Sequence, residues 1–180
     1  DLHRLDFTIN TLAIRLDSDH YGELMDFYGG EQDLKDGLIR VLHSLSFIED
    51  PTRMLRAARF EQRLHFSIEA RTAELIENAL PMLARVSGER IRHELYLILR
   101  EQEPEHALRR LDELKVLGHI HPRLHCDAPV QSLFARLRQA LADGVWKLGE
   151  DTYRPAPGLY LALLTCRLDY EIKSGTGRLD

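Results

Sequence analysis

Residues 46–66 constrain the fold more than any other stretch, because a helix start is followed there by a regular arginine pattern. Asp50 can accept a hydrogen bond from a free backbone N–H as an N-cap, and Pro51 suits the first helical position. At about 100° per residue, the arginines that follow fall within an arc of about 120°. They are Arg53, Arg56, Arg59 and Arg63. The sequence therefore predicts a helix with a guanidinium stripe along one side and a carboxylate at its positive end.

Two interpretations of this helix are open from the pattern alone. In the first, Asp50 is only a cap and the arginines form a solvated face, as most runs of charge do. In the second, Asp50 and Arg53 are neighbours three residues apart and form a polar site for a nucleotide. A carboxylate accepts hydrogen bonds from a base amino group, and a guanidinium donates them in fixed fork geometry. Such a pair can read the edge of a base.

Three stretches of the chain carry a family pattern in their order and spacing. Residues 49–60 read Glu-Asp-Pro-Thr-Arg-Met-Leu-Arg-Ala-Ala-Arg-Phe, residues 1–10 contain Arg-Leu-Asp-Phe-Thr-Ile-Asn, and residues 86–95 contain Ser-Gly-Glu-Arg-Ile-Arg-His-Glu-Leu. All three resemble motifs of class II tRNA nucleotidyltransferases and bacterial poly(A) polymerases. The resemblance runs from Asp1 to about His121 and favours the nucleotide site over the solvated face.

The resemblance implies roles for individual residues. Asp50 and Arg53 match the pair that reads the base edge, and Arg56 and Arg59 match further nucleotide contacts. Arg4 belongs to the opening motif, where the family has two consecutive arginines. Here the second arginine, which contacts nucleotide in the family, is replaced by Leu5. Arg4 then either serves in its place or forms a local ion pair with Asp6, which contributes little to stability.

The family also has an Asp-x-Asp pair that holds metal ions for phosphoryl transfer. It lies upstream of the opening motif, whereas Asp17 and Asp19 lie downstream of it, in a segment whose composition predicts a hairpin turn. We therefore expect no catalytic residue and no metal ligand in this chain. We expect the Mg²⁺ site in a preceding segment, and no nucleotidyltransferase activity from the chain alone.

The remaining chemistry-bearing residues favour structural roles. His119, His121, His125, Cys126 and Asp127 cluster in the sequence, but their spacing matches no zinc pattern and a second Cys/His pair is missing. Glu89, Arg90, Arg92 and Glu94 are expected to brace the arginine helix. Trp146 and Tyr153 can stack on bases, but aromatic residues in a helical domain are more often core.

Composition limits the environment and the partners. The chain has 180 residues, 44% hydrophobic and 29% charged, with two cysteines and a net charge of −5. These values suit a globular protein with no disulfide framework, and we expect it in the cytoplasm. No apolar run reaches the ~18 residues of a membrane span. Because the net charge is negative, RNA binding requires a local basic surface.

The order of patterns predicts a mainly α fold that begins with a small α+β remnant. Short apolar runs predict strands in 7–16, 23–27 and 38–42, with a turn at Gly29 and one helical turn near Asp33. Helical spacing then predicts the segments 69–80, 87–100, 104–118, 131–142 and 158–168. By resemblance, 1–45 is the C-terminal part of a nucleotidyltransferase head, 46–125 a helical neck and 126–180 the start of a helical body.

The resemblance implies a template-independent RNA 3′-end nucleotidyltransferase, of which this chain is a piece. Its substrates are ATP and possibly CTP, its partner is RNA, most often the 3′ end of a tRNA, and its cofactor is Mg²⁺. The products A, CCA and poly(A) remain open, because the family shares the base-reading pair, and the oligomeric state is open too. The alternative is a non-catalytic helical RNA-binding module.

Overall fold

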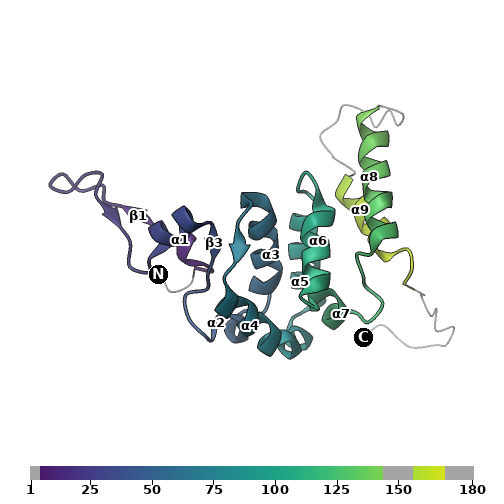
Figure 1. Ribbon diagram of the computed structural model, residues 1–180, viewed down its shortest axis with the longest axis horizontal. Coiled ribbons are helices and arrows are strands. Elements are labelled where there is room, and N and C mark those ends of the chain that lie inside the picture. Colours follow the sequence, from purple (N-terminus) through teal and green to yellow (C-terminus); the bar gives the residue numbers. More distant parts are fainter. Residues whose placement is uncertain (1–4, 144–155, 169–180) are drawn as a thin grey trace, which may run out of the picture.

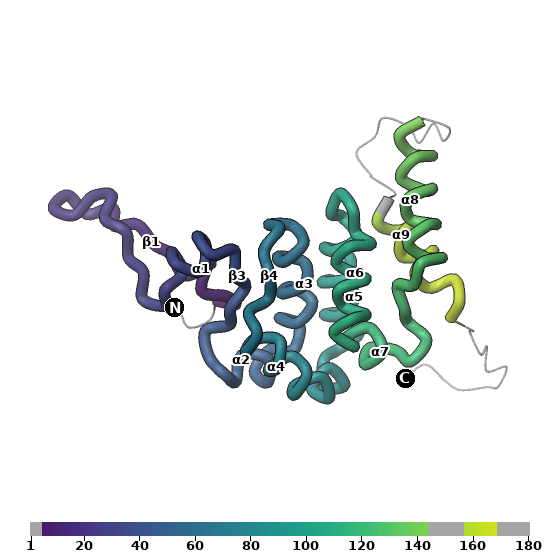
Figure 2. The backbone as a smooth tube through the Cα atoms, viewed as in Figure 1, coloured from purple at the N-terminus to yellow at the C-terminus, as the bar shows by residue number. Residues whose placement is uncertain are grey.

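The computed structural model describes residues 5–143 and 156–168. In this part of the chain, the elements follow one another in a row, from the hairpin of β1 (Ala13–Ile14) and β2 (Leu24–Met25) to α8 (Ala128–Ala142) and α9 (Ala156–Thr165) (Figures 1 and 2). Arg4, Trp146 and Tyr153 lie outside the described residues, so their predicted roles stay predictions.

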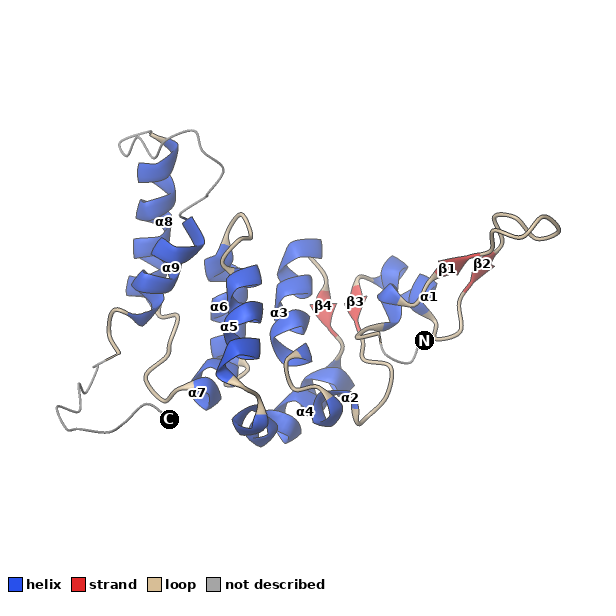
Figure 3. Ribbon diagram, turned by 180° about the vertical axis from the view of Figure 1, so that it is seen from behind, coloured by secondary structure: helices blue, strands red, loops and turns tan. Residues whose placement is uncertain are grey.

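Short strands and helices alternate in the first part of the chain. They are β1 (Ala13–Ile14), β2 (Leu24–Met25), α1 (Gly30–Asp36), β3 (Leu38–Ile39), α2 (Ser46–Glu49), α3 (Arg53–Leu64) and β4 (Ser67–Ile68). The rest is helical (Figure 3), with α4 (Ala70–Ala79), a 3-10 segment (Leu80–Arg85), α5 (Gly88–Ile98), α6 (Pro104–Glu113), α7 (Val116–Ile120), α8 (Ala128–Ala142) and α9 (Ala156–Thr165). The prediction of a mainly α fold with a small β-containing N-terminal part is confirmed. No described helix is long and apolar enough to cross a membrane.

The strands form two small sheets. β1 and β2 make an antiparallel hairpin in which Ala13 faces Met25. β3 and β4 pair in parallel, with Leu38 opposite Ser67, so they join segments on either side of α3. β4 was not predicted, because two residues carry no recognisable alternation.

The prediction of a strand over 7–16 is wrong for its first half. Thr8–Asn10 is a 3-10 turn, and only Ala13–Ile14 is a strand. The Thr8 hydroxyl donates to the buried Asp33 carboxylate at 2.6 Å, and the Thr8 N–H donates to the Arg40 carbonyl at 3.0 Å. The second bond belongs to an isolated antiparallel bridge between Phe7 and Val41, so the segment pairs at one point and does not continue as a strand.

The glycine pair at the start of α1 has two different causes. Gly29 has φ +75°, the left-handed conformation that favours glycine, and it precedes the helix as the predicted turn. Gly30 begins α1, and a Cβ there would collide with the Thr8 carbonyl oxygen. Close approach between α1 and the 3-10 turn therefore requires a residue without a side chain at Gly30.

Helix α3 lies at the centre of the described fold, packed against β3 and β4 on one side and α5 and α6 on the other (Figure 1). Met54, Leu55, Ala57 and Ala58 are fully buried. Because alanine has the smallest apolar side chain, the pair at 57 and 58 lets neighbouring elements approach the helix closely. The hydrophobic residues between the arginines thus supply the core of the fold.

The buried Glu61 side chain of α3 forms hydrogen bonds with both β4 and α6. Its side chain accepts hydrogen bonds from the Ile68 N–H of β4 at 2.8 Å and from Arg110 Nε of α6 at 2.7 Å. Burial normally disfavours the Arg110 charge, but the hydrogen bond and charge of Glu61 outweigh it, so the pKa of Arg110 is raised. The pair ties α6 and β4 to α3.

The helical region follows the predicted ranges in part. α5 lies within the predicted segment 87–100, and the Ser87 hydroxyl caps it by accepting from the Arg90 N–H at 3.4 Å. The predicted helix over 104–118 is instead broken at Lys115, which has φ +63° and separates α6 from α7, while Gly118 lies inside α7. α8 begins at Ala128, three residues before the prediction, because Asp127 accepts from the Val130 N–H at 3.1 Å.

We predict that Glu61→Ala lowers the free energy of unfolding by about 3 kcal/mol, because it leaves Arg110 and the Ile68 N–H without their acceptor. Urea unfolding of the purified chain measures this change. Glu74→Ala is the matched control, since it removes a carboxylate from the exposed Arg71–Glu74 ion pair, which contributes about 0–1 kcal/mol. Equal shifts for the two variants would contradict the stabilising role of Glu61.

Candidate nucleotide site

Asp50 lies at the junction between α2 and α3 and caps the turn that leads into α3. Its Oδ1 accepts hydrogen bonds from the Thr52 N–H at 3.0 Å and from the Thr52 hydroxyl at 2.6 Å. The regular helix begins at Arg53, whose N–H donates to the Asp50 carbonyl at 3.1 Å. The predicted capping of a free backbone N–H by Asp50 is therefore present, although Pro51 and Thr52 form a turn before the regular helix.

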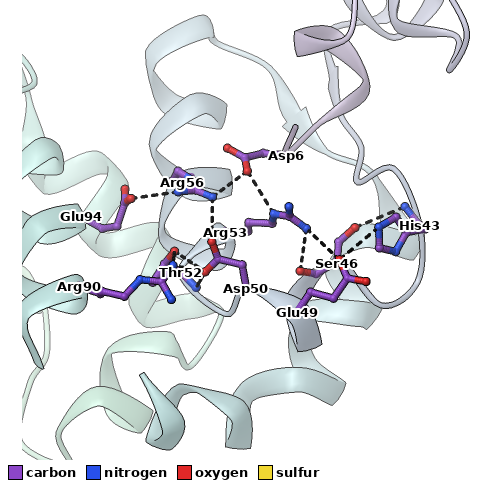
Figure 4. Close-up of polar contacts among 10 residues, drawn as sticks. All are labelled: Asp6, His43, Ser46, Glu49, Asp50, Thr52, Arg53, Arg56, Arg90 and Glu94. Carbon is purple, nitrogen blue, oxygen red and sulfur yellow. Dashed lines mark hydrogen bonds and ion pairs between the residues drawn. The ribbon is translucent and has the colours of Figure 1, made fainter. Parts of the chain in front are cut away.

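The Asp50 carboxylate also contacts two arginines. Arg56 Nη2 lies 3.3 Å from Oδ2, and Arg90 Nη2 of α5 lies 2.9 Å from Oδ1 (Figure 4). Burial favours the protonated acid, but the bonds from Thr52 and the charges of Arg56 and Arg90 outweigh it and lower the pKa of Asp50. Asp50 is therefore ionised at neutral pH, as an acceptor of base amino groups must be.

Arg53 is buried and held by groups outside its own helix. Its Nε donates to Asp6 Oδ1 at 3.1 Å, and its Nη1 donates to the Ser46 carbonyl of α2 at 3.1 Å (Figure 4). Only 6% of Arg53 is exposed. Because two fixed acceptors hold different nitrogens, the plane of the guanidinium is set by the protein.

Asp6 joins the opening motif to the arginine helix. Its Oδ1 also accepts from Arg56 Nη2 at 2.7 Å, so one carboxylate oxygen bridges two guanidinium groups (Figure 4). Asp6 was expected at most as a local partner of Arg4. The signal for its role was its place in the opening family motif, but the pairing spans 47 and 50 residues of sequence.

Helix α5 contacts the site through a series of ion pairs along α3. Arg90 reaches Asp50, Glu94 Oε1 lies 3.2 Å from Arg56 Nη1, and Glu101 follows beyond the end of α5. Burial lowers the pKa of Arg56, but Asp6, Glu94 and Asp50 outweigh it, so the pKa is raised. The predicted bracing is observed for Arg90 and Glu94, but the prediction is wrong for Glu89 and Arg92, which are exposed on α5.

The arginine stripe divides into two parts. Arg53 and Arg56 meet Asp6, whereas Arg59 and Arg63 lie 3.6 and 3.8 Å from Glu101. The solvated-face interpretation is wrong for Arg53, Arg56 and Arg59, whose side chains are 7%, 20% and 11% exposed, and fits only Arg63 at 57%. The structure brings Asp50, Arg53 and Arg56 into one cluster and sets Arg59 apart from it.

The two other clusters considered from the sequence have structural partners. Asp17 accepts from Arg15 at 2.9 and 2.8 Å in the hairpin turn, and these bonds, with that of His20, lower its pKa. His125 bonds to Asp112 at 3.1 Å. Burial raises the pKa of the Cys126 thiol to about 12. In residues 5–143 and 156–168, no group of three or more His, Cys, Asp or Glu residues is placed to hold a metal ion.

Comparisons with known proteins agree with this arrangement. The family model described as the poly A polymerase head domain matches residues 1–40. A second model, described as the probable RNA and SrmB-binding site of polymerase A, matches residues 65–127. The A-adding tRNA nucleotidyltransferase of Geobacter sulfurreducens is 53% identical over 126 residues, which is 69% of this chain and 14% of that protein.

Solved structures extend the similarity over nearly the whole chain. A CCA-adding enzyme in complex with ATP is 39% identical, with a TM-score of 0.82, and the match covers 95% of this chain and 40% of that one. The Thermotoga maritima CCA-adding enzyme complexed with tRNA is also 39% identical, with a TM-score of 0.78, over 95% of this chain and 42% of that one. These matches thus identify the chain as similar to part of proteins of the nucleotidyltransferase class. Within this class, it belongs to the family of tRNA nucleotidyltransferases and bacterial poly(A) polymerases.

We predict that Asp50→Asn destabilises the chain at neutral pH but not in acid. Because folding lowers the pKa of Asp50, its ionised carboxylate stabilises the folded state at pH values above the ordinary pKa of 3.8. This stabilisation is lost as the pH falls through the folded-state pKa. Asparagine keeps the capping oxygen but removes the charge that faces Arg56 and Arg90. Urea unfolding at pH 7, 5 and 3 measures the stability gap between parent and variant. A gap that stays constant down to pH 3 would show that the charge does not stabilise the fold.

Proposed function

We propose that the full-length protein to which this chain belongs is a tRNA nucleotidyltransferase that adds AMP to the tRNA 3′ end. AMP is the nucleotide common to A-adding and CCA-adding enzymes, whose names the similar proteins carry. The observation that carries the proposal is the cluster of Asp50, Arg53 and Arg56, in which both arginines are held by groups from three other parts of the chain, namely Asp6, Ser46 and Glu94.

In this proposal, Asp50 and Arg53 read the edge of the incoming base. The Asp50 carboxylate is ionised and 21% exposed, and its bond to Arg56 is long at 3.3 Å, so a base amino group can replace that contact. The guanidinium of Arg53 is already oriented by Asp6 and the Ser46 carbonyl. A fixed guanidinium and a carboxylate offer donors and an acceptor in one place, which a base edge requires.

The residues described here do not form a metal site, so the proposal places Mg²⁺ and its paired carboxylates in the remainder of the full-length protein. In phosphoryl transfer, such metal ions neutralise charge as the 3′ hydroxyl attacks the α-phosphate and pyrophosphate leaves. The cluster around Asp50 then binds and orients the nucleotide and does not act on the reacting atoms. Residues 1–45, 46–125 and 126–180 are proposed as head, neck and body.

Local basic groups support RNA as the partner despite the net charge of −5. Three exposed arginines lie close to α5: Arg85 precedes the helix, Arg92 is on it and Arg100 follows it. None of them forms an ion pair within the described residues. Unpaired guanidinium groups are free to meet phosphates. The alternative of a non-catalytic RNA-binding module is disfavoured, because the similar proteins are named nucleotidyltransferases.

We predict that Asp50→Asn and Arg53→Lys in the full-length protein each lower nucleotide selectivity or AMP incorporation about tenfold, equivalent to ~1.4 kcal/mol. Asparagine presents a mixed donor and acceptor face, and lysine loses the planar fork. Single-nucleotide incorporation into tRNA lacking its terminal A, with ATP and CTP, measures both effects. Arg71→Lys, in an exposed pair on α4, is the control. Parent-like selectivity in both variants, with intact folding, would refute base reading.

We also predict that the 180-residue chain alone incorporates no nucleotide, even with Mg²⁺, because its described part offers no metal-binding carboxylate cluster. Incubation with tRNA and labelled ATP tests this. Sustained incorporation that disappears in Asp17→Asn or Asp19→Asn would assign catalysis to the hairpin turn instead.

A further inference from the structure

A polar pocket lies toward the other end of α3, away from Asp50. It has a volume of about 210 Å³ and lies between the end of α3, residues 101–103 and the start of α6. Its charged and amide side chains are Arg59, Gln62, Arg63, Glu101, Gln102 and Glu103. Pockets for drug-sized ligands start at about 300 Å³, so this one suits a single chemical group.

The charged groups of this α3–α6 pocket leave hydrogen-bonding capacity unused. Glu101 Oε1 lies 3.6 Å from Arg59 Nη1 and 3.8 Å from Arg63 Nη1, both beyond hydrogen-bond distance. Arg59 Nε is buried and has no hydrogen-bond partner among the described residues. In the nucleotide cluster, Arg56 Nε and Glu94 Oε2 are also buried without a partner, but Asp6 and Arg56 form a direct hydrogen bond of 2.7 Å there. In the pocket, Arg59 and Glu101 thus lie within ion-pair distance but form no direct hydrogen bond.

The balance of charges selects the class of ligand. Two arginines and two glutamates line the pocket, and two glutamine amides add both donors and acceptors. Glu103 also lies 3.6 Å from His106 Nδ1 and 3.7 Å from Arg138 Nη2. A phosphate placed here would meet the carboxylates at close range, which disfavours binding. A neutral planar group with donors and acceptors on its edge meets complementary partners instead. The Arg59 guanidinium, whose carbon lies 4.8 Å from the Phe60 ring centroid, and His65 and His106 in the lining are planar groups of the kind on which bases stack.

We propose that the α3–α6 pocket binds an unpaired base of the RNA substrate. This inference rests on the proposed function for the presence of RNA, but it concerns a separate place. Gln62 and Arg63 lie six and seven residues after Arg56 within α3, so this end of the pocket lies about 10 Å further along α3 than the nucleotide cluster. The pocket therefore holds a base other than that of the incoming nucleotide and positions the RNA strand.

Side-chain amide resonances of Gln62 and Gln102 in the 15N-labelled chain report on the pocket directly. The titrants are a single-stranded tetraadenylate, a tetramer of the same length with abasic ribose, and inorganic phosphate. We expect the tetraadenylate to shift both resonances, and the other two titrants to leave them in place. Equal shifts with the abasic tetramer or with phosphate would make the pocket an anion site and overturn the proposal.

The outcomes separate this proposal from the proposed function. If the tetraadenylate shifts backbone amides near Arg92 or Arg100 and leaves Gln62 and Gln102 unchanged, the base pocket is refuted while RNA binding stands. If no resonance moves, both the pocket and RNA binding by this chain are refuted.

The Glu101→Gln variant decides between a base and a phosphate by the sign of its effect. A base that donates to Glu101 loses a charged acceptor, so we expect about tenfold weaker binding of the tetraadenylate. A phosphate loses a repelling charge, so stronger binding would overturn the proposal. Glu77→Gln is the matched control, because Glu77 forms an exposed ion pair with Lys115, and we expect its affinity to equal that of the parent. Thermal unfolding of each variant establishes that it is folded, and unchanged affinity in folded Glu101→Gln would also refute the base contact.

Discussion

The bridging of two arginines by Asp6 is the interaction on which the centre of the structure depends. A guanidinium removed from water costs several kcal/mol unless it is paired and hydrogen-bonded. Arg53 is 6% exposed, and the first turn of α3 packs fully buried Met54 and Leu55 beside it. Because Asp6 supplies the charge that Arg53 needs, the segment containing Asp6 must stay against α3 for the helix to keep its apolar face buried.

The same arrangement joins stability to binding. The groups that neutralise Arg53 and Arg56 also set the orientation of each guanidinium, as the Ser46 carbonyl does for Arg53 and Glu94 does for Arg56. A binding site assembled in this way is ordered before a ligand arrives, so less conformational entropy is lost when the ligand binds. Changes in the supporting residues are therefore expected to alter both folding and nucleotide recognition.

Local signals in the sequence identified much of this structure. The Asp50-Pro51 start, the helical spacing in α4–α6 and the turn around Asp17 follow from interactions between residues a few positions apart. The family motifs implied a common site for Asp50, Arg53, Arg56 and Arg59, and the structure brings the first three together while Arg59 lies beside Glu101. Their partners were harder to predict, because contacts over 38 to 50 residues, such as those of Arg56 with Glu94 and Asp6, leave no periodic pattern. The break between α6 and α7 at Lys115 was not predicted, because lysine rarely adopts positive φ. Gly118 was the more typical residue for a helix C-terminus.

The parallel pairing of β3 with β4 has a mechanical consequence. Gly37 and Ile39 accept backbone hydrogen bonds from Ser67 and Glu69 at 2.8 and 3.0 Å, so the segment before α3 is clasped to the segment after it. The linker between β3 and α3 cannot act as a hinge while this pairing is intact, because a rotation there would break the hydrogen bonds between β3 and β4. We therefore expect β3, α3 and β4 to move as one rigid unit. A change in the angle between domains would then occur in the chain after β4.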